Sequence, residues 1–414
     1  MLMKCRFCAL WGFFLLLMVA CQQVTPTAEP LPTLPPTVTG TATAVNTPTA
    51  TSAPSATATP PPPPATPTPL PTAVPSPTPT EEVVSAAEPA QTATPIQQEG
   101  WIGPYTFPPN TNPLTGLPMR ADLLAQRPLA IKISNYPPLV RPQYGLGRAD
   151  LLFEHYAEGS ATRFTAVFYS QGADLVGSVR SGRLIDLEIP MMYDAAFAYS
   201  GASGPVRLRF RDSPFFGRII SPDFAHGGFE RIPEEGKALE HTLYTNTDTL
   251  RYLLDERGEN HAPTLANHMA FSAEPPEGGA AVSRFAINYI GTYANWFYQA
   301  GSNQYLRWTD GEPHLDAGTE EQLSFSNVIV VGAHHQETDI IEDVGGNLSI
   351  QIQLWGEGPV SIFRNGQRFE GVWRRTDPSH MLTFYDKDGN ILPLTPGTSF
   401  FHIVPLGFTG LVEG

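Results

Sequence analysis

The sequence predicts an α+β protein, in which a mixed α/β domain is followed by a β-rich, mainly antiparallel domain and preceded by a disordered stalk. Residues 22–99 hold 20 of the chain's 43 prolines and contain no aromatic residue, lysine or arginine. Between residues 129 and 256, strand-like and helix-like patterns alternate. From residue 285 onward, almost every apolar run is short, rich in β-formers and bounded by turn sequences.

The N-terminus has the features of a lipoprotein signal. Lys4 and Arg6 precede the apolar run Leu10–Ala20, which is too short for the ~20 residues that span a bilayer. The run ends in the sequence MVAC, which resembles the bacterial lipobox with Met18 where leucine is more usual. We therefore predict a signal peptide over residues 1–20, lipidation of Cys21, and a location on the extracytoplasmic side of the cell membrane.

Composition excludes several classes of chemistry. The three cysteines lie at Cys5, Cys8 and Cys21, so the chain beyond the predicted signal cannot form a disulfide or a cysteine-ligated zinc site. The net charge is −15, and an acidic protein lacks the basic footprint that nucleic-acid binding requires. We expect no nucleic-acid partner.

Residues 21–99 are predicted to be a disordered stalk, because they have too little apolar surface to compensate for ordering the chain. Their proline content favours extended polyproline II conformations, so the segment should act as a semi-rigid spacer between a membrane and a folded body. A tract of serine, threonine and proline can also carry O-linked sugar, and the sequence leaves glycosylation open.

The first folded domain is predicted over residues 100–271. Leu129–Ser134 and Arg163–Tyr169 have strand patterns, whereas Ala149–Glu158, Leu184–Tyr193 and Leu243–Glu256 have helical ones. Three arginines alternate with apolar residues in the run VRLRFR at residues 206–211. That alternation predicts a strand with one basic face and one buried face.

A break at residues 272–281, which read SAEPPEGGAA, is predicted to be the linker to the second domain. The second domain, residues 282–414, should be mainly strand. Its expected strands, separated by turn sequences such as Arg364–Gln367 and Asp386–Asn390, are Phe285–Ile290, Asn327–Val331, Leu348–Leu354, Val360–Phe363 and Leu382–Tyr385.

Several stretches resemble the YerB-like family of bacterial envelope lipoproteins. In the first half they are NPLTGLP at residues 112–118, RPLAIKISN at 127–135, RPQYGLGRADLLFEHYAEGSATRF at 141–164 and VGSVRSGR at 176–183. In the second half they are GEPHLD at 311–316, NVIVV at 327–331, FEGVWRR at 369–375 and FYDKDGN at 384–390. The resemblance implies a lipoprotein with an α/β-type domain followed by a β-rich one. It implies no established reaction, so no catalytic residue is assigned from it.

Two carboxylates are candidates for chemistry. Glu154 and Glu158 are four residues apart and would share one face of a helix over Ala149–Glu158. Paired carboxylates are what glycoside hydrolysis requires. The alternative, which we favour, is a solvated helix face on which Arg163 forms an ion pair, because structural ion pairs are commoner than catalytic ones.

Arginines are concentrated in the best-matched segments, at Arg141, Arg163, Arg180 and Arg183. Arginine recognises carboxylate or phosphate through a planar two-pronged fork. Arginines that fix loops through backbone hydrogen bonds account for the pattern about equally well. We predict that Arg163, Arg180 and Arg183 converge on one cleft, close to Glu154 or Glu158.

These features favour a non-enzymatic binding or scaffolding module of the cell envelope, anchored to the membrane by its lipid. A cell-wall polymer or another envelope protein is the expected partner, and no cofactor is expected. No metal site is expected either, because His314 and Asp316 fit no metal-binding spacing. The competing hypothesis is an envelope hydrolase that acts on glycan or peptidoglycan through Glu154 or Glu158. The ligand and the oligomeric state are not predicted.

Overall fold

A twelve-stranded mixed sheet forms the framework of the computed structural model, which describes residues 98–414. The predicted signal peptide, Cys21 and nearly all of the stalk lie outside the described residues. The main path of the sheet runs in the order β19 (Thr383–Tyr385), β18 (Gln367–Arg375), β17 (Gly356–Arg364), β15 (Asn327–Ile341), β20 (Ser399–Pro405), β2 (Leu151–Tyr156), β3 (Thr162–Phe168), β1 (Leu129–Ser134), β5 (Ala196–Ala198) and β6 (Ile219–Ile220). Two further strands join its side, with β16 (Leu348–Gln353) on β15 and β9 (Ala280–Ala281) on β18.

Strand β20, close to the C-terminus, joins the two halves of the chain. It pairs in parallel with β15 on one side and with β2 on the other. Strands from residues 100–271 and from residues 282–414 therefore belong to one continuous sheet, and residues 98–414 belong to a single compact unit. Independent folding of the two stretches, which the expected boundary at 272–281 implies, stays a prediction.

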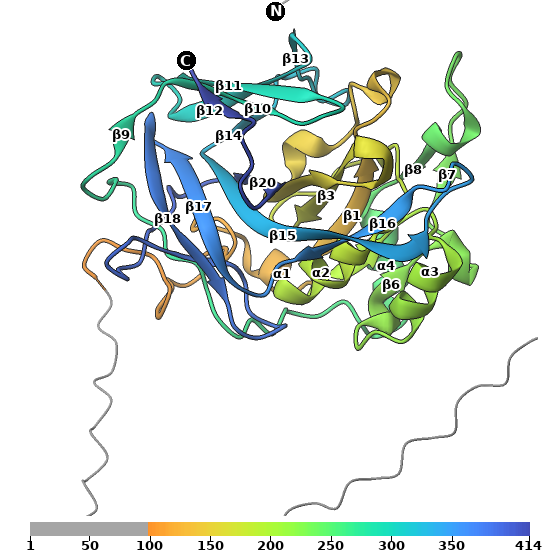
Figure 1. Ribbon diagram of the computed structural model, residues 1–414. Coiled ribbons are helices and arrows are strands. Elements are labelled where there is room, and N and C mark those ends of the chain that lie inside the picture. Colours follow the sequence, from red (N-terminus) through yellow and green to blue (C-terminus); the bar gives the residue numbers. More distant parts are fainter. Residues whose placement is uncertain (1–97) are drawn as a thin grey trace, which may run out of the picture. The chain divides into compact units, whose positions relative to one another are not determined.

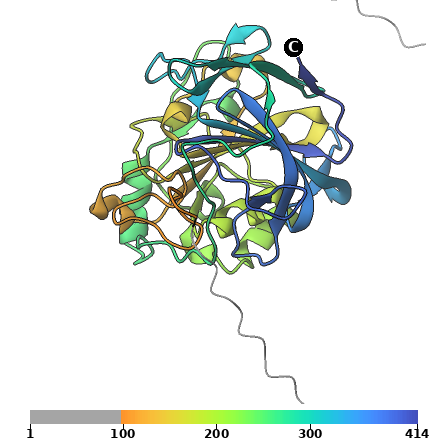
Figure 2. The ribbon, with the colours of Figure 1, turned by 90° about the vertical axis from the view of Figure 1, so that its left-hand side faces the viewer.

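Two smaller sheets complete the β structure. The first is antiparallel and contains β13 (Glu312–Pro313), β12 (Gln304–Thr309), β11 (Tyr293–Gln299), β10 (Arg284–Asn288) and β21 (Leu411–Glu413), with β14 (Ser324–Phe325) added to β12. It forms a layer against one face of the large sheet (Figures 1 and 2). The second contains β4 (Val176–Gly177), β8 (Leu243–Thr245) and β7 (Glu230–Arg231).

The helices are short. The α-helices are α1 (Ala121–Leu124), α2 (Ile189–Met192), α3 (Gly204–Arg211) and α4 (Thr247–Asp255). The 3₁₀ turns are η1 (Pro138–Val140), η2 (Leu146–Arg148), η3 (Glu158–Ser160), η4 (Leu184–Leu187), η5 (Phe216–Arg218), η6 (Pro222–Phe224) and η7 (Leu239–His241). Among residues 98–414, no helix has the length and apolar character needed to cross a membrane.

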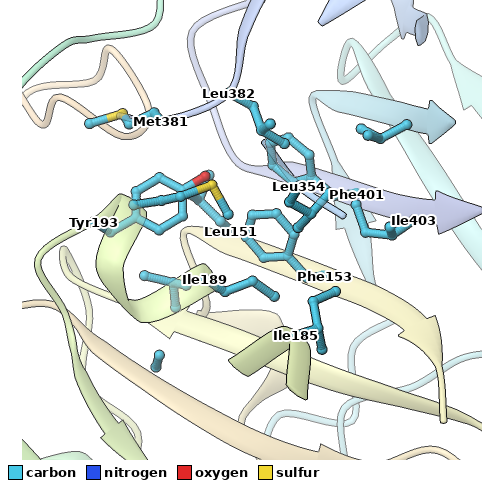
Figure 3. Close-up of a cluster of buried hydrophobic side chains, with 14 of the residues drawn as sticks. Leu151, Phe153, Ile185, Ile189, Tyr193, Leu354, Met381, Leu382, Phe401 and Ile403 are labelled. Carbon is cyan, nitrogen blue, oxygen red and sulfur yellow. The ribbon is translucent and has the colours of Figure 1, made fainter. Parts of the chain in front are cut away.

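Central strands of the large sheet are buried on both faces. Because side chains alternate along a strand, Leu151 and Phe153 point to one core and Leu152 points to the other. The first core packs against η4 and α2 through residues such as Ile185 and Ile189 (Figure 3). The second core lies between the large sheet and the six-stranded sheet. Six of its aromatic side chains are Phe164, Phe285, Trp296, Tyr305, Phe363 and Phe400.

The predicted fold class is confirmed, and most of the predicted strands correspond to observed ones. Three element assignments were wrong or incomplete. Ala149–Glu158 is not a helix, because residues 151–156 form β2. The run at 206–211 lies in helix α3 instead of a strand. Leu243–Glu256 divides into β8 and α4, with Asn246 capping the helix through a hydrogen bond from the Thr249 N–H. Leu184–Tyr193 is helical as predicted, as η4 followed by α2.

Candidate functional site

Glu154 and Glu158 do not share a helix face, because residues 151–156 form strand β2 and the expected helix is absent. Glu154 lies within the strand and its side chain is fully buried. Its Oε2 accepts a hydrogen bond from Arg307 Nη2 at 2.9 Å, and its Oε1 accepts one from Asn135 Nδ2 and one from Thr162 Oγ1, each at 2.8 Å. Glu158 lies beyond the strand, in η3. The pair therefore does not form a two-carboxylate catalytic site.

The Glu154 network extends into the six-stranded sheet, and Arg307 Nη1 is its one buried donor without a hydrogen-bond partner among the described residues. The Trp296 indole N–H donates to His402 Nε2 at 2.9 Å, so the ring hydrogen of His402 lies on Nδ1, which is 3.0 Å from the Tyr289 hydroxyl. Burial and the neighbouring Arg307 hold the pKa of His402 well below its usual value, which keeps the ring neutral. The Arg307 guanidinium also lies 4.6 Å from the Phe400 ring centroid. This network joins two layers of the fold, and the side chains of Glu154, Arg307 and His402 are fully buried.

A second buried polar cluster supports the turn that carries the candidate arginines. Lys132 Nζ on β1 donates to Asp186 Oδ1 at 2.9 Å and to Thr165 Oγ1 at 3.0 Å. Burial lowers the pKa of Lys132 to about 8, although the Asp186 charge opposes the shift. The other carboxylate oxygen of Asp186 accepts the backbone N–H of Arg183 at 2.7 Å. Asp186 thus links the backbone of Arg183 to Lys132 on strand β1 and fixes its position.

Glu158 binds two of the predicted arginines. Arg163 Nη2 donates to Glu158 Oε1 at 2.6 Å, and Arg183 forms a two-pronged pair with both oxygens of the same carboxylate. Burial alone would raise the pKa of Glu158, but the hydrogen bond from Arg183 and the charge of Arg163 lower it to about 2. Both guanidinium groups are nearly buried, so this triad holds β3, η3 and the 176–183 segment together.

A polar pocket of about 340 Å³ opens beside this triad, and we call it the arginine pocket. Arg180, Arg183 and Arg231 line it together with three acidic residues. The remaining residues that line it are Ser181, Ser200, Gly201, Ala202, Ser203, Asp223, Glu240, Leu243 and Glu342. They come from segments far apart in the sequence, including the ends of β4 and β5, the start of α3, η6, and the turn after β15.

Arg180 is the arginine of this pocket that is best placed to receive a ligand. Its hydrogen bond to the Glu240 carbonyl is long, at 3.4 Å, and the side chain is half-buried. Burial lowers the pKa of Arg180, and Glu240 opposes that shift. Because an arginine side chain carries five N–H donors, most of its donor capacity is available to a carboxylate or phosphate.

We predicted that Arg163, Arg180 and Arg183 converge on one cleft near Glu154 or Glu158. Arg180 and Arg183 line the arginine pocket, whereas Arg163 binds Glu158 without lining it, and Glu154 and Arg141 lie elsewhere. Arg141 Nη2 contacts Asp310 Oδ2 of the turn after β12 at 2.6 Å. A ligand-binding role for any of the six residues stays a prediction.

Sequence reasoning missed Asp223 and Glu342 of the pocket, and the buried Lys132–Asp186 pair beneath it. Glu342 is more than a hundred positions from each arginine of the pocket in the chain, and no spacing pattern connects them. Residues 201–203, which lie directly before α3, supply one wall of the pocket. Among residues 98–414, no group of three or more His, Cys, Asp or Glu side chains is arranged to hold a metal ion.

A larger hollow, of about 1400 Å³, lies elsewhere on the body. Turns and loops around Gly100, Glu277 and Asp388 line it, and many of their side chains are exposed. It lacks the buried charged side chains of the arginine pocket, so we consider the smaller pocket the better candidate for selective binding.

Comparisons with known proteins agree with this architecture. The family model described as the N-terminal domain of a protein of unknown function (DUF3048) matches residues 114–260, and the model for its C-terminal domain matches residues 285–401. The chain is 29% identical over 297 residues to a Bacillus subtilis (strain 168) protein described as "Putative lipoprotein YerB", covering 71% of this chain and 86% of that protein.

A solved structure shares the fold. The crystal structure of the YerB protein from Bacillus subtilis matches with a TM-score of 0.62 and 26% sequence identity, over 73% of this chain and 99% of that one. The two matched family domains, the sequence identity and the common fold lead to one conclusion: the chain belongs to the YerB-like family and contains both the N-terminal and the C-terminal DUF3048 domain.

Proposed function

We propose that this protein is an envelope lipoprotein, anchored through Cys21 on the extracytoplasmic side of the membrane, whose body binds an anionic component of the cell wall in the arginine pocket. The lipobox-like sequence and the description of the Bacillus subtilis relative as a lipoprotein support the anchor. The observation that carries the binding role is Arg180, a half-buried arginine that lines the pocket with most of its donors available.

The chemistry of arginine defines the ligand's anionic group. A guanidinium binds carboxylate or phosphate through two parallel hydrogen bonds. Stem peptides of peptidoglycan and anionic wall polymers carry these groups at the proposed location. The hydrolase alternative has less support, because Glu154 is fully buried and Glu158 is paired with two arginines that hold its pKa near 2. Neither carboxylate is placed to exchange a proton with a substrate.

The anchor is tested by the variant Cys21→Ala. The variant should not incorporate labelled fatty acid, because the thiol is the acceptor of the lipid, and the protein should no longer sediment with membranes. Fatty-acid labelling and membrane fractionation of cells that express either form measure both effects. Labelling of the variant at the level of the unmodified protein would contradict the assignment.

The binding role is tested at Arg180. We expect Arg180→Ala to weaken the binding of soluble peptidoglycan and wall-polymer fragments about tenfold or more, since it removes a charge-assisted pair. Arg180→Lys should restore part of the affinity, because an ammonium lacks the planar fork. Calorimetric titration measures both, with Arg209→Ala as the matched control on the exposed side of α3. Equal affinity of Arg180→Ala and the unmodified protein contradicts the proposal.

A further inference from the structure

Several polar atoms around the arginine pocket have no hydrogen-bond partner among residues 98–414. The side chain of Glu342 is fully withdrawn from solvent, yet neither carboxylate oxygen accepts a hydrogen bond. The nearest cationic atom is Arg183 Nη1, 3.7 Å from Glu342 Oε2. Asp223 Oδ2 and Ser203 Oγ are also buried without a hydrogen-bond partner. All three residues line the same pocket.

These atoms identify what the pocket lacks. Buried polar atoms in native proteins nearly always have partners, because an unpaired one loses its hydrogen bonds to water without replacement. Carboxylate oxygens only accept hydrogen bonds. The missing partner must therefore bring N–H or O–H donors, and beside two carboxylates a positively charged donor is favoured.

Arg180, which lines the same pocket, favours a negatively charged acceptor in place of a positively charged donor. Arg180 needs an acceptor, and an anion satisfies it best. A ligand with only negative groups would satisfy Arg180 but would also approach Glu342 and Asp223, which line the same space. The lining contains three arginines and three acidic residues, so its charges of the two signs are balanced in number.

We propose that the arginine pocket binds a zwitterionic ligand, an amino acid or short peptide, with its carboxylate on Arg180 and its free ammonium on Glu342. This inference rests on the proposed function and narrows its ligand class. The volume of about 340 Å³ is at the lower end of the range for small-molecule pockets, which suits one or two amino-acid residues. An ammonium has three N–H donors, enough for both Glu342 oxygens and Asp223.

The position of Glu342 allows this contact. The residue lies in the turn that connects β15 to β16, directly before an exposed tip formed by Asp343–Asn347. The neighbouring backbone is tied down by the hydrogen bond from the Glu342 N–H to the Asn347 carbonyl, at 2.9 Å. The turn backbone is therefore held in place, with Glu342 among the residues that line the pocket.

The experiment compares three dipeptide probes by calorimetric titration of the full-length protein in detergent. Ala-Ala has both charged ends, N-acetyl-Ala-Ala has only the carboxylate, and Ala-Ala amide has only the ammonium. The unmodified protein should bind Ala-Ala at least tenfold more tightly than either blocked form, because only the zwitterion contacts both Arg180 and Glu342. In Glu342→Gln, the preference for Ala-Ala over N-acetyl-Ala-Ala should fall below about threefold, while the affinity for N-acetyl-Ala-Ala stays unchanged.

The control is Glu337→Gln, an exposed glutamate on the same strand, β15, which should keep the full preference. Equal affinities of the unmodified protein for Ala-Ala and N-acetyl-Ala-Ala overturn the zwitterion inference and leave the anion site intact. Failure of every carboxylate-bearing probe and every wall fragment to bind overturns the proposed function itself. If Glu342→Gln loses both probes and its melting temperature drops, Glu342 is structural and the inference is wrong.

Discussion

Glu154 and Glu158 are only four residues apart in the chain, yet their surroundings differ. Glu154 pairs with Arg307, and Glu158 pairs with Arg163 and Arg183. Glu154 points between the large and the six-stranded sheet, and both its oxygens accept hydrogen bonds from buried partners. Glu158 lies beyond the end of β2 and pairs with arginines at the border of a pocket. Both oxygens of Glu154 are therefore paired within the fold, whereas the pocket beside Glu158 contains buried carboxylate oxygens without hydrogen-bond partners.

The difference shows how buried charge can be assigned to structure or to binding. A buried ion pair whose members are fully hydrogen-bonded joins parts of the fold and offers nothing to a ligand. A buried charge that lacks partners stays unfavourable until something supplies them. The Glu154 carboxylate, whose two oxygens both accept hydrogen bonds, belongs to the first kind, and the Glu342 carboxylate belongs to the second.

The largest change in stability is expected when the buried Glu154–Arg307 pair is broken. Glu154→Gln leaves the Arg307 charge buried without a counterion, and we expect the free energy of unfolding to fall by about 3–5 kcal/mol. Urea unfolding measures the loss. Glu357→Gln, in an exposed pair with Arg374, is the matched control and should change stability by less than about 1 kcal/mol.

The double variant Glu154→Gln/Arg307→Met sharpens this test. Removing both charges should restore part of the stability, because the remaining groups no longer include an unpaired ion. A loss in the double variant equal to the sum of the two single losses would show that Glu154 and Arg307 do not act as a pair.

The sequence predicted the two-part composition of the fold better than its local details. Leu129–Ser134 was assigned correctly because its alternation and β-branched residues agree with a buried strand. The run at 149–158 was misassigned as helix because β2 is buried on both faces, so it lacks the polar alternation that marks a half-exposed strand. The arginine run at 206–211 alternates as a strand would, yet the chain forms a helix with Val206 and Phe210 on its buried side.

The candidate site was predictable only in part. The concentration of arginines in the segments that resemble the family predicted the grouping of Arg163, Arg180 and Arg183. The partners that give the pocket its character come from distant strands and turns, and Glu342 reaches it only because β15 continues past the edge of its pairing with β17 and β20. Such contacts depend on sheet order, which local patterns do not encode.

A smaller change in stability is expected for Glu158, which pairs with Arg163 and Arg183, and this change depends on pH. The folded-state pKa of Glu158 is about 2, below its ordinary value of 4.5. The ionised carboxylate therefore stabilises the folded state by roughly 3 kcal/mol above pH 4.5, and this contribution is lost as the pH falls toward 2. Glu158→Gln should remove it at every pH. The difference in unfolding free energy between the unmodified protein and the variant should thus narrow from roughly 3 kcal/mol at pH 6 to about 1 kcal/mol near pH 3.

Urea unfolding of both proteins between pH 6 and pH 3 measures this convergence. Other carboxylates titrate in the same range, but they are common to both proteins and cancel in the difference. Glu370→Gln, on the partly exposed pair with Arg368, is the control and should give a small difference that hardly changes with pH. A constant difference for Glu158→Gln across the range would mean that the two arginines do not depress the pKa of Glu158. Packing, and not the ion pairs, would then hold Glu158, Arg163 and Arg183 together beside the pocket.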